Sequence, residues 1–225
     1  MRKAQVFEFF RRLAETDPAP ETELQFSNSY QLLVAVVLSA QATDAGVNRA
    51  TRALFQKVKT PSQMVALGEA GLKEHIKTIG LFNTKAKNVI ALSEKLVAEH
   101  GGAVPHTREA LMALPGVGRK TANVVLNCAF GAETFAVDTH IFRLGNRTGL
   151  APGKTPEAIE ARLEKIVPQP FRRHAHHWLI LHGRYVCKAR KPECWRCEVA
   201  ELCGYRAKTA PPPGAGLPTS LERAP

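Results

Sequence analysis

Apolar residues recur at helical spacing along most of the chain. In the segment 83–102, Val89, Leu92 and Leu96 fall at intervals of three and four residues, so they share one face of a helix. Gly101 follows, at a position where glycine commonly ends a helix. The same pattern predicts helices over 43–58, 60–67, 107–116, 119–131, 138–149, 155–168 and 170–186. Strand-like alternation is scarce, so the pattern predicts an all-α protein.

Capping residues mark where several of these helices begin. The segment 28–41 is apolar almost all round, which is typical of a central buried helix, and Asn28 or Ser29 precedes it as a candidate N-cap. Thr43 or Asp44 would cap the next helix. Pro61 follows Thr60 at a position where proline commonly starts a helix.

The charge balance indicates that this helical protein has an acidic partner. Lysine and arginine number 31 against 20 aspartates and glutamates, which gives a net charge of +11. Such an excess favours a polyanion as partner, although a solvated basic surface is the simpler alternative. The longest apolar run, 32–40, is too short to cross a membrane, and the first residues carry no secretory signal. We therefore expect a cytoplasmic protein without membrane association.

Four of the five cysteines cluster near the C-terminus. Cys187, Cys194, Cys197 and Cys203 follow the spacing C-x6-C-x2-C-x5-C. In a reducing compartment this grouping indicates a metal site, and spacing alone leaves zinc and an iron–sulfur cluster both open. Cys128 lies far from the group in sequence, and we interpret it as a small buried residue.

The segment 114–121, which reads LPGVGRKT, combines a glycine turn with two cations. A phosphate-binding P-loop needs glycine directly before the lysine, and Arg119 stands there instead. The alternative is a helix, a glycine turn and a second helix that begins near Gly118 or Arg119. The free amides and positive end of that second helix would suit a phosphate.

This segment, continued as LPGVGRKTANVVLN, resembles the helix-hairpin-helix motif of the DNA glycosylase superfamily, and most closely that of the endonuclease III family. The stretches LLVAVVLSAQATD, IKTIGLFNTKA, FAVDTHIFR and HHWLILHGRYVC resemble the same family in the same order. With the cysteines, the resemblance covers roughly residues 1–206. The cysteine spacing is similar to the [4Fe–4S] loop of this family, so the resemblance implies a [4Fe–4S] cluster with a structural role.

The resemblance implies two catalytic residues. Lys120 would be the nucleophile that attacks C1′ of a damaged nucleotide as a free amine, because an ammonium has no lone pair. Without the resemblance, a phosphate contact is the simpler role for such a lysine. Asp138 would be the carboxylate that faces the lysine and stabilises positive charge on the sugar. Its place ahead of a helical run also predicts an N-cap, and the two roles are compatible.

The resemblance also implies residues that contact DNA once the target base has left the stack. Gln41 would hydrogen-bond to the orphaned base and Leu81 would fill the gap, although Gln41 could simply end a helix and Leu81 could be core. His140 would line the lesion pocket. The other predicted contacts lie in the hairpin and in the basic cysteine loop: Gly116, Val117, Gly118, Arg119, Lys188, Arg190 and Lys191.

Together these inferences predict two helical domains with a cleft between them. One domain spans 22–132 and contains the hairpin at about 107–130; the other joins 1–21 to 133–206 and carries the cluster loop 187–203. A disordered tail is expected over 207–225. The implied function is a monomeric DNA glycosylase with AP lyase activity on oxidised pyrimidines in double-stranded DNA that contains damaged bases or abasic sites. A monofunctional adenine-type glycosylase and a non-catalytic DNA-binding protein are the alternatives.

Overall fold

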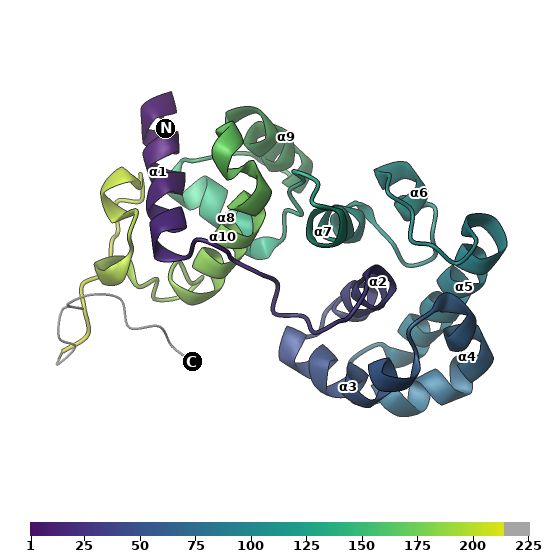
Figure 1. The fold of residues 1–225 in the computed structure, drawn as a ribbon. Helices are drawn as coiled ribbons and strands as arrows, with labels where there is room; N and C mark the ends of the chain where they lie inside the picture. The colour runs from purple at the N-terminus through teal and green to yellow at the C-terminus, as the bar shows by residue number, and fades with distance from the viewer. Residues whose placement is uncertain (214–225) are drawn as a thin grey trace. The chain divides into compact units, whose positions relative to one another are not determined.

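The computed structural model describes residues 1–213, which form helices joined by turns and loops (Figure 1). No strand is present in this part of the chain, so the all-α prediction is confirmed. The α-helices are α1 (Lys3–Thr16), α2 (Ser29–Leu38), α3 (Asp44–Lys57), α4 (Pro61–Ile76), α5 (Phe82–His100), α6 (Arg108–Met112), α7 (Arg119–Phe130), α8 (Thr139–Thr148), α9 (Pro156–Ile166) and α10 (Arg172–Tyr185). Three short 3-10 helices follow α9 and α10: η1 (Gln169–Phe171), η2 (Cys194–Arg196) and η3 (Ala200–Leu202).

The chain divides into two compact units, and one of them is discontinuous. Residues 22–132 form the first unit, whereas residues 1–21 join the described residues from 133 onward to form the second. Each unit has its own hydrophobic core. The hairpin and its lysine therefore belong to one unit, and Asp138 and the cysteine loop belong to the other.

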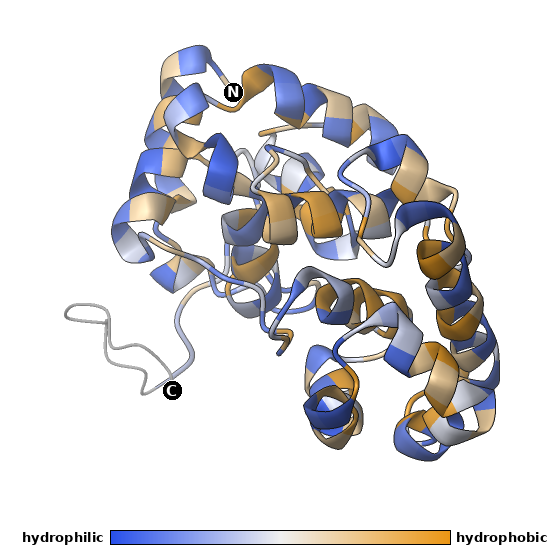
Figure 2. Cartoon of the chain, turned by 45° about the vertical axis from the view of Figure 1, so that its right-hand side comes forward, coloured by the Kyte–Doolittle hydropathy of each residue, from blue (hydrophilic) through white to orange (hydrophobic). Residues whose placement is uncertain are grey.

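Helix α2 is the centre of the 22–132 unit. Nine of its ten residues are buried, from Tyr30 to Leu38, as its nearly continuous apolar sequence predicted. It contacts α3, α5 and α7, while α4 packs along α5. Around it, the helices alternate hydrophobic and hydrophilic residues, as expected where each buries one face (Figure 2). The buried α2 thus fixes the loop that follows it, which carries Gln41.

Three helix starts in this unit are capped by the residues that the sequence indicated. The Asn28 side chain accepts a hydrogen bond from the Gln31 amide, and Thr43 caps α3. Thr60 caps α4 with Pro61 at its first position, and Gly101 ends α5 in the left-handed conformation. The helix predicted over 60–67 ends where α4 is interrupted, at Gly68 with a φ of +72°, whereas the part of α4 beyond this residue was not predicted.

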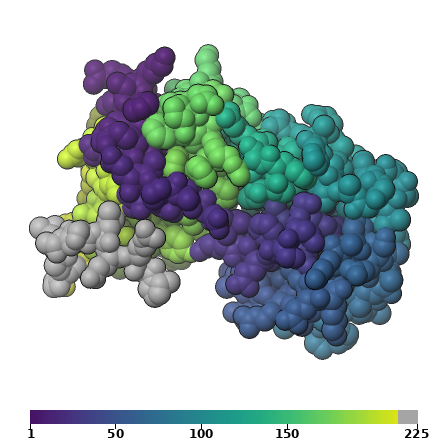
Figure 3. Space-filling view, in the orientation of Figure 1, coloured from purple at the N-terminus to yellow at the C-terminus, as the bar shows by residue number. Residues whose placement is uncertain are grey.

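The N-terminal helix completes the core of the second unit. Phe9 and Phe10 are fully buried there beside Trp178, and α1 contacts α10. The Trp178 indole donates a 2.7 Å hydrogen bond to the carbonyl of Asp17, which fixes the end of α1. In Figure 3 the purple N-terminal residues lie directly against the green surface of the later helices. This packing explains why the unit is built from both ends of the sequence.

The described chain continues as an ordered segment beyond the boundary expected at 207. Lys208 donates a hydrogen bond to the carbonyl of Cys203, and the Thr209 hydroxyl accepts one from the Cys194 amide. These contacts fasten residues 208 and 209 to the cysteine loop. The rest of the predicted tail, 214–225, lies outside the described residues. No helix between residues 1 and 213 is long and apolar enough to cross a membrane.

Candidate active site and metal centre

The glycine hairpin presents the first turn of α7 to solvent. Gly116 has a φ of +75°, and a Cβ atom there would lie 2.9 Å from the Asn88 side chain, so only glycine fits this turn. Val117 is buried and anchors the turn, with its amide donating to the carbonyl of Leu114. Gly118 is the N-cap of α7 and offers no side chain to its amides. The start of α7 therefore keeps the free N–H groups that a phosphate needs.

Lys120 lies in this first turn and is exposed, as is Arg119 beside it. Because Gly118 has no side chain, nothing at the N-cap position covers the approach to the Lys120 amine. The hairpin thus places an exposed primary amine in the first turn of a helix whose N-cap has no side-chain acceptor.

Asp138 is the N-cap of α8, as its sequence position predicted. Its Oδ1 accepts hydrogen bonds of 2.9 Å from the backbone amides of His140 and Ile141. Both bonds use the same oxygen, so capping leaves Oδ2 for other interactions. The residue is half-buried at the surface of its unit. The two N–H bonds fix the orientation of the carboxylate, which suits electrostatic stabilisation of a cation.

Helix α8 is tied to the cysteine loop by Arg143. Its guanidinium donates to the carbonyls of Cys187, at 3.1 Å, and Gly183, at 2.6 Å. The same group lies 3.4 Å from Nδ1 of half-buried His140. Burial lowers the pKa of Arg143, although nearby Cys187 and Asp138 oppose that shift. Arg143 therefore couples the position of the helix that carries Asp138 and His140 to the first cysteine.

Strained backbone marks three of the residues that were predicted to contact DNA. Between residues 1 and 213, the non-glycine residues with positive φ are Gln41 (54°), Leu81 (59°) and Lys191 (50°). For an L-amino acid this conformation costs about 1–2 kcal/mol, and such strain concentrates at functional sites. All three are exposed, and the Leu81 side chain retains 56% of its accessible surface. An exposed leucine in strained backbone is hard to explain as core.

Gln41 and Leu81 lie on neighbouring loops of the 22–132 unit. A Cβ atom on Gly80 would approach the Gln41 carbonyl to 4.0 Å. The two loops follow α2 and α4 respectively, so residues forty positions apart in sequence come together at one edge of the helical unit. Two side chains that enter the same gap in a duplex must lie close together, as these two loops do.

All four clustered cysteines line a single cavity in the other unit. Cys128 is not part of it; this residue packs half-buried against the core of the 22–132 unit. Three of the four sulfurs have a nitrogen within hydrogen-bonding distance. Arg147 Nη1 lies 3.5 Å from Cys187, a ring nitrogen of His182 lies 3.4 Å from Cys197, and the Tyr205 amide lies 3.4 Å from Cys203.

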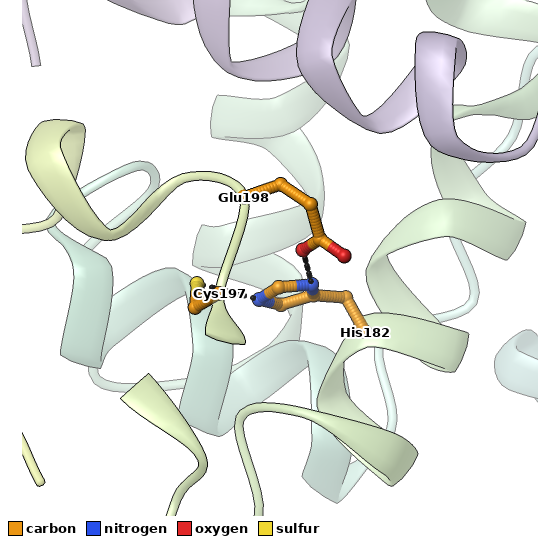
Figure 4. A group of neighbouring side chains, drawn as sticks. All are labelled: His182, Cys197 and Glu198. Atoms are coloured by element: carbon orange, nitrogen blue, oxygen red, sulfur yellow. Dashed lines mark hydrogen bonds and ion pairs between the residues drawn. The ribbon is translucent and has the colours of Figure 1, made fainter. Parts of the chain in front are cut away.

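The sulfur environment fits a thiolate cluster. Burial raises the pKa of the Cys197 thiol to about 12 and also raises that of Cys203, so buried thiolates here need a metal to replace the proton. The N–H donors around the sulfurs are the outer-shell partners that such ligands require. Figure 4 shows His182 between Cys197 and Glu198, with 3.5 Å between its Nδ1 and the glutamate Oε2.

Sequence reasoning missed these outer-shell residues. His182 is 6% exposed, and burial lowers its pKa to about 4, so its imidazole is neutral. It lies five residues before Cys187 on α10, whereas Arg147 comes from α8. A histidine on the helix that leads into a cysteine loop is the one signal that could have indicated His182. Arg147 was not detectable, because its contact depends on how α8 packs.

The basic cysteine loop offers fewer free cations than its sequence suggested. Lys188 is half-buried and forms a 2.5 Å ion pair with Glu193, so its charge is partly neutralised. Arg190 and Lys191 are exposed. Of the three predicted phosphate contacts, the latter two are the better placed.

The fold and these sites define a helix-hairpin-helix DNA repair protein with an iron–sulfur loop. Residues 34–169 match the family described as HhH-GPD superfamily base excision DNA repair protein. Residues 187–203 match the iron–sulfur binding domain of endonuclease III. The chain is 57% identical over 208 residues to endonuclease III of Escherichia coli (strain K12), covering 92% of this chain and 99% of the relative. Endonuclease III of Rickettsia conorii is 57% identical over 200 residues, which cover 89% of this chain and 94% of the relative.

Solved structures agree with these relatives. A trapped covalent intermediate of endonuclease III with DNA has a TM-score of 0.84 at 42% identity, covering 91% of this chain and 96% of the other. A thermostable thymine-DNA glycosylase has a TM-score of 0.76 at 27% identity, and the match covers 90% of this chain and 94% of the other. The chain belongs to the endonuclease III family. It is a base excision repair DNA glycosylase that acts on DNA and holds a [4Fe–4S] cluster in its cysteine loop.

The capping role of Asp138 can be separated from any role in catalysis. Asp138→Ala should lower the free energy of unfolding by about 1 kcal/mol, because two amides of α8 lose their acceptor. Asp138→Asn should stay within about 0.5 kcal/mol of the wild type, since asparagine caps equally well. Urea unfolding followed by circular dichroism measures both, and equal stability of all three proteins would contradict the capping assignment.

Removing one cluster ligand should empty the cysteine loop. Cys203→Ala should lower the bound iron and its visible absorption by more than about 10-fold, since a ligand contributes more than an outer-shell group does. Cys128→Ala, which leaves the cavity untouched, should retain full iron content. Iron analysis and absorption spectra of the two purified variants test this, and equal iron loss in both would contradict the ligand assignment.

Proposed function

We propose that this glycosylase is bifunctional, with Lys120 as the nucleophile of both base removal and strand cleavage. The observation that carries the proposal is the exposed Lys120 amine in the first turn of α7, directly after the uncapped glycine turn. The trapping of a related endonuclease III as a covalent intermediate with DNA supports a nucleophile within the protein. A monofunctional enzyme would activate water and would not need this amine.

In the proposed reaction, the Lys120 amine attacks C1′ of the damaged nucleotide and the bond between C1′ and the base breaks. The base leaves with the bonding electron pair and takes up a proton. The nitrogen lone pair then closes an imine with C1′ as the sugar ring opens. Loss of a proton from C2′ expels the 3′ phosphate by β-elimination. The substrates that we propose, oxidised pyrimidines, follow from the family resemblance.

Asp138 is proposed to stabilise the positive charge that develops on the sugar and to assist proton transfer. Its Oδ1 is held by two backbone amides, so the orientation of the carboxylate is fixed before substrate binds. Its Oδ2 is not used by the cap and is available to the nucleotide. His140, two residues further on and held beside Arg143, is proposed to line the lesion pocket.

Gln41 and Leu81 are proposed to occupy the space that the extruded nucleotide leaves in the duplex. The left-handed backbone at both residues turns an amide and an apolar side chain outward from adjacent loops. Hairpin amides together with Arg190 and Lys191 are proposed to bind the DNA backbone. The compartment that we propose is the cytoplasm, where bacterial DNA lies and where unpaired thiols stay reduced.

Borohydride trapping on an abasic duplex tests the nucleophile. The wild type should form a covalent adduct, and Lys120→Gln should form none while its excision rate falls by about 10³-fold or more. Asp138→Asn should fold normally but react about 10²–10³-fold more slowly, since one charge-stabilising group is lost. Lys154→Gln is the matched control, because it makes the same change at an exposed lysine outside every predicted site and should still yield adduct.

The trapping experiment also separates the alternatives. Base release without a wild-type adduct would indicate a monofunctional glycosylase, and neither product would indicate a binding protein. An undiminished adduct with Lys120→Gln would reject this nucleophile while leaving a lyase in place.

Replacing Leu81 by glycine should raise the stability of the protein and lower its activity. Leu81→Gly should raise the free energy of unfolding by up to about 1 kcal/mol, because glycine adopts a φ of 59° without strain. Excision from duplex DNA should fall by about 10-fold or more, since nothing then fills the gap. Val97→Ala, a similarly exposed apolar change on α5, is the control and should leave excision unchanged. Duplex excision at the wild-type rate in Leu81→Gly would contradict the wedge role.

A further inference from the structure

Lys85, in the first turn of α5, is a buried cation that nothing in the proposed reaction uses. The residue is 4% exposed, and its Nζ is buried without a hydrogen-bond partner among the described residues. Other lysines of the same unit have acidic partners, for example Lys73 with Glu69 and Lys77 with Glu74. Buried lysines are rare unless they are paired, and an unpaired buried polar group in a native protein calls for an explanation.

The position of Lys85 in its helix is unfavourable for a second reason. The N-terminal end of a helix carries a partial positive charge, which favours anions and opposes cations. Burial also lowers the pKa of Lys85. An amine placed in this way is stabilised only when an anion joins it, and the described residues supply none.

The start of α5 has the other features of an anion site. Its N-cap is Leu81, whose side chain cannot accept a hydrogen bond, so the first amides of the helix have no side-chain cap. Side chains on a helix lean toward its N-terminus, so the long Lys85 side chain can extend to these same amides. Asn83 and Thr84 are exposed, so the end of the helix is open to a large ligand.

We propose that the start of α5 binds a phosphate of the DNA strand, held by the uncapped amides of the first turn and by the Lys85 amine. This inference rests on the proposed function, since it places the phosphate next to the Leu81 wedge. The amine leaves its apolar cover by rotation of its four-carbon side chain when the phosphate arrives. Binding thus relieves an unpaired buried cation, and the strand is held beside the gap that Leu81 fills.

A phosphate is favoured over a base oxygen because the site combines a cation with a positive helix end. Both features select negative charge, whereas a base carbonyl is neutral. The salt dependence of binding separates the two, since only a phosphate contact releases a counterion.

The test measures binding of the iron-loaded protein to a duplex with a tetrahydrofuran abasic analogue, by fluorescence anisotropy over a range of KCl concentrations. Lys85→Met should reduce the slope of log affinity against log salt by about 0.9. Between 50 and 200 mM KCl, the wild type should therefore lose about 3.5-fold more affinity than the variant. Lys85→Arg, which retains a cation, should keep the wild-type slope.

Lys87→Met is the matched control, because it removes the same charge from an exposed position on the same helix. An equal slope change in this control would show a general charge effect and would overturn the proposal. An unchanged slope in Lys85→Met would overturn it as well. Urea midpoints accompany the binding data: Lys85→Met should be at least as stable as the wild type, and a variant that fails to fold would show that the amine is structural.

The binding results expected for the Lys85 variants do not depend on whether Lys120 is the nucleophile. The abasic analogue is not cleaved, so Lys120→Gln should bind it with a slope close to that of the wild type if Lys120 acts in chemistry. Failure of covalent trapping would reject the proposed mechanism and leave the Lys85 result standing. A wild-type slope in Lys85→Met together with normal trapping would reject the phosphate site alone.

Discussion

Every α-helix begins with backbone N–H groups that have no hydrogen-bond acceptor within the same helix. The helices of this protein differ in whether a side chain accepts these groups. At five helix starts the side chain of the N-cap residue accepts one of them: Asn28, Thr43, Thr60, Thr107 and Thr155. Helices α5 and α7 begin instead at Leu81 and Gly118, which provide no acceptor. Helix α8 is capped by Asp138, whose Oδ1 accepts from two amides while Oδ2 is not used by the cap. Leu81, Gly118 and Asp138, which are proposed to act on DNA, thus all stand at helix starts, although α10 also begins without a side-chain cap, at Phe171.

The cysteine loop depends on helices that are distant from it in sequence. Its short 3-10 turns have little apolar surface of their own, and α8 and α10 supply the groups that surround the sulfurs. Arg147 holds the loop by donating to the carbonyls of Lys188 and Ala189, and its guanidinium lies over the Tyr205 ring. A cluster in this loop therefore stabilises the unit that carries Asp138 as well as the loop itself.

Local signals in the sequence predicted the features that a few neighbouring residues determine. Caps, the buried α2, the glycine turn and the cysteine spacing were all accessible in this way. The left-handed backbone at Gln41 and Leu81 was not, because nothing in the sequence requires a non-glycine residue with positive φ. Helical spacing likewise could not distinguish buried Lys85 from an ordinary surface lysine, since its burial is decided by how α5 packs against α2 and α4.

The discontinuous unit has a consequence for the order in which the chain is made. Helix α1 leaves the ribosome first, yet its core partners, such as Trp178, follow more than 150 residues later. Residues 22–132 have all their core partners within their own span and can fold during synthesis. Until α10 has been made, the buried face of α1, with Phe9 and Phe10, lacks part of the surface that covers it. The nascent chain thus exposes these aromatic side chains until α10 follows, and apolar surface exposed in this way is prone to aggregation.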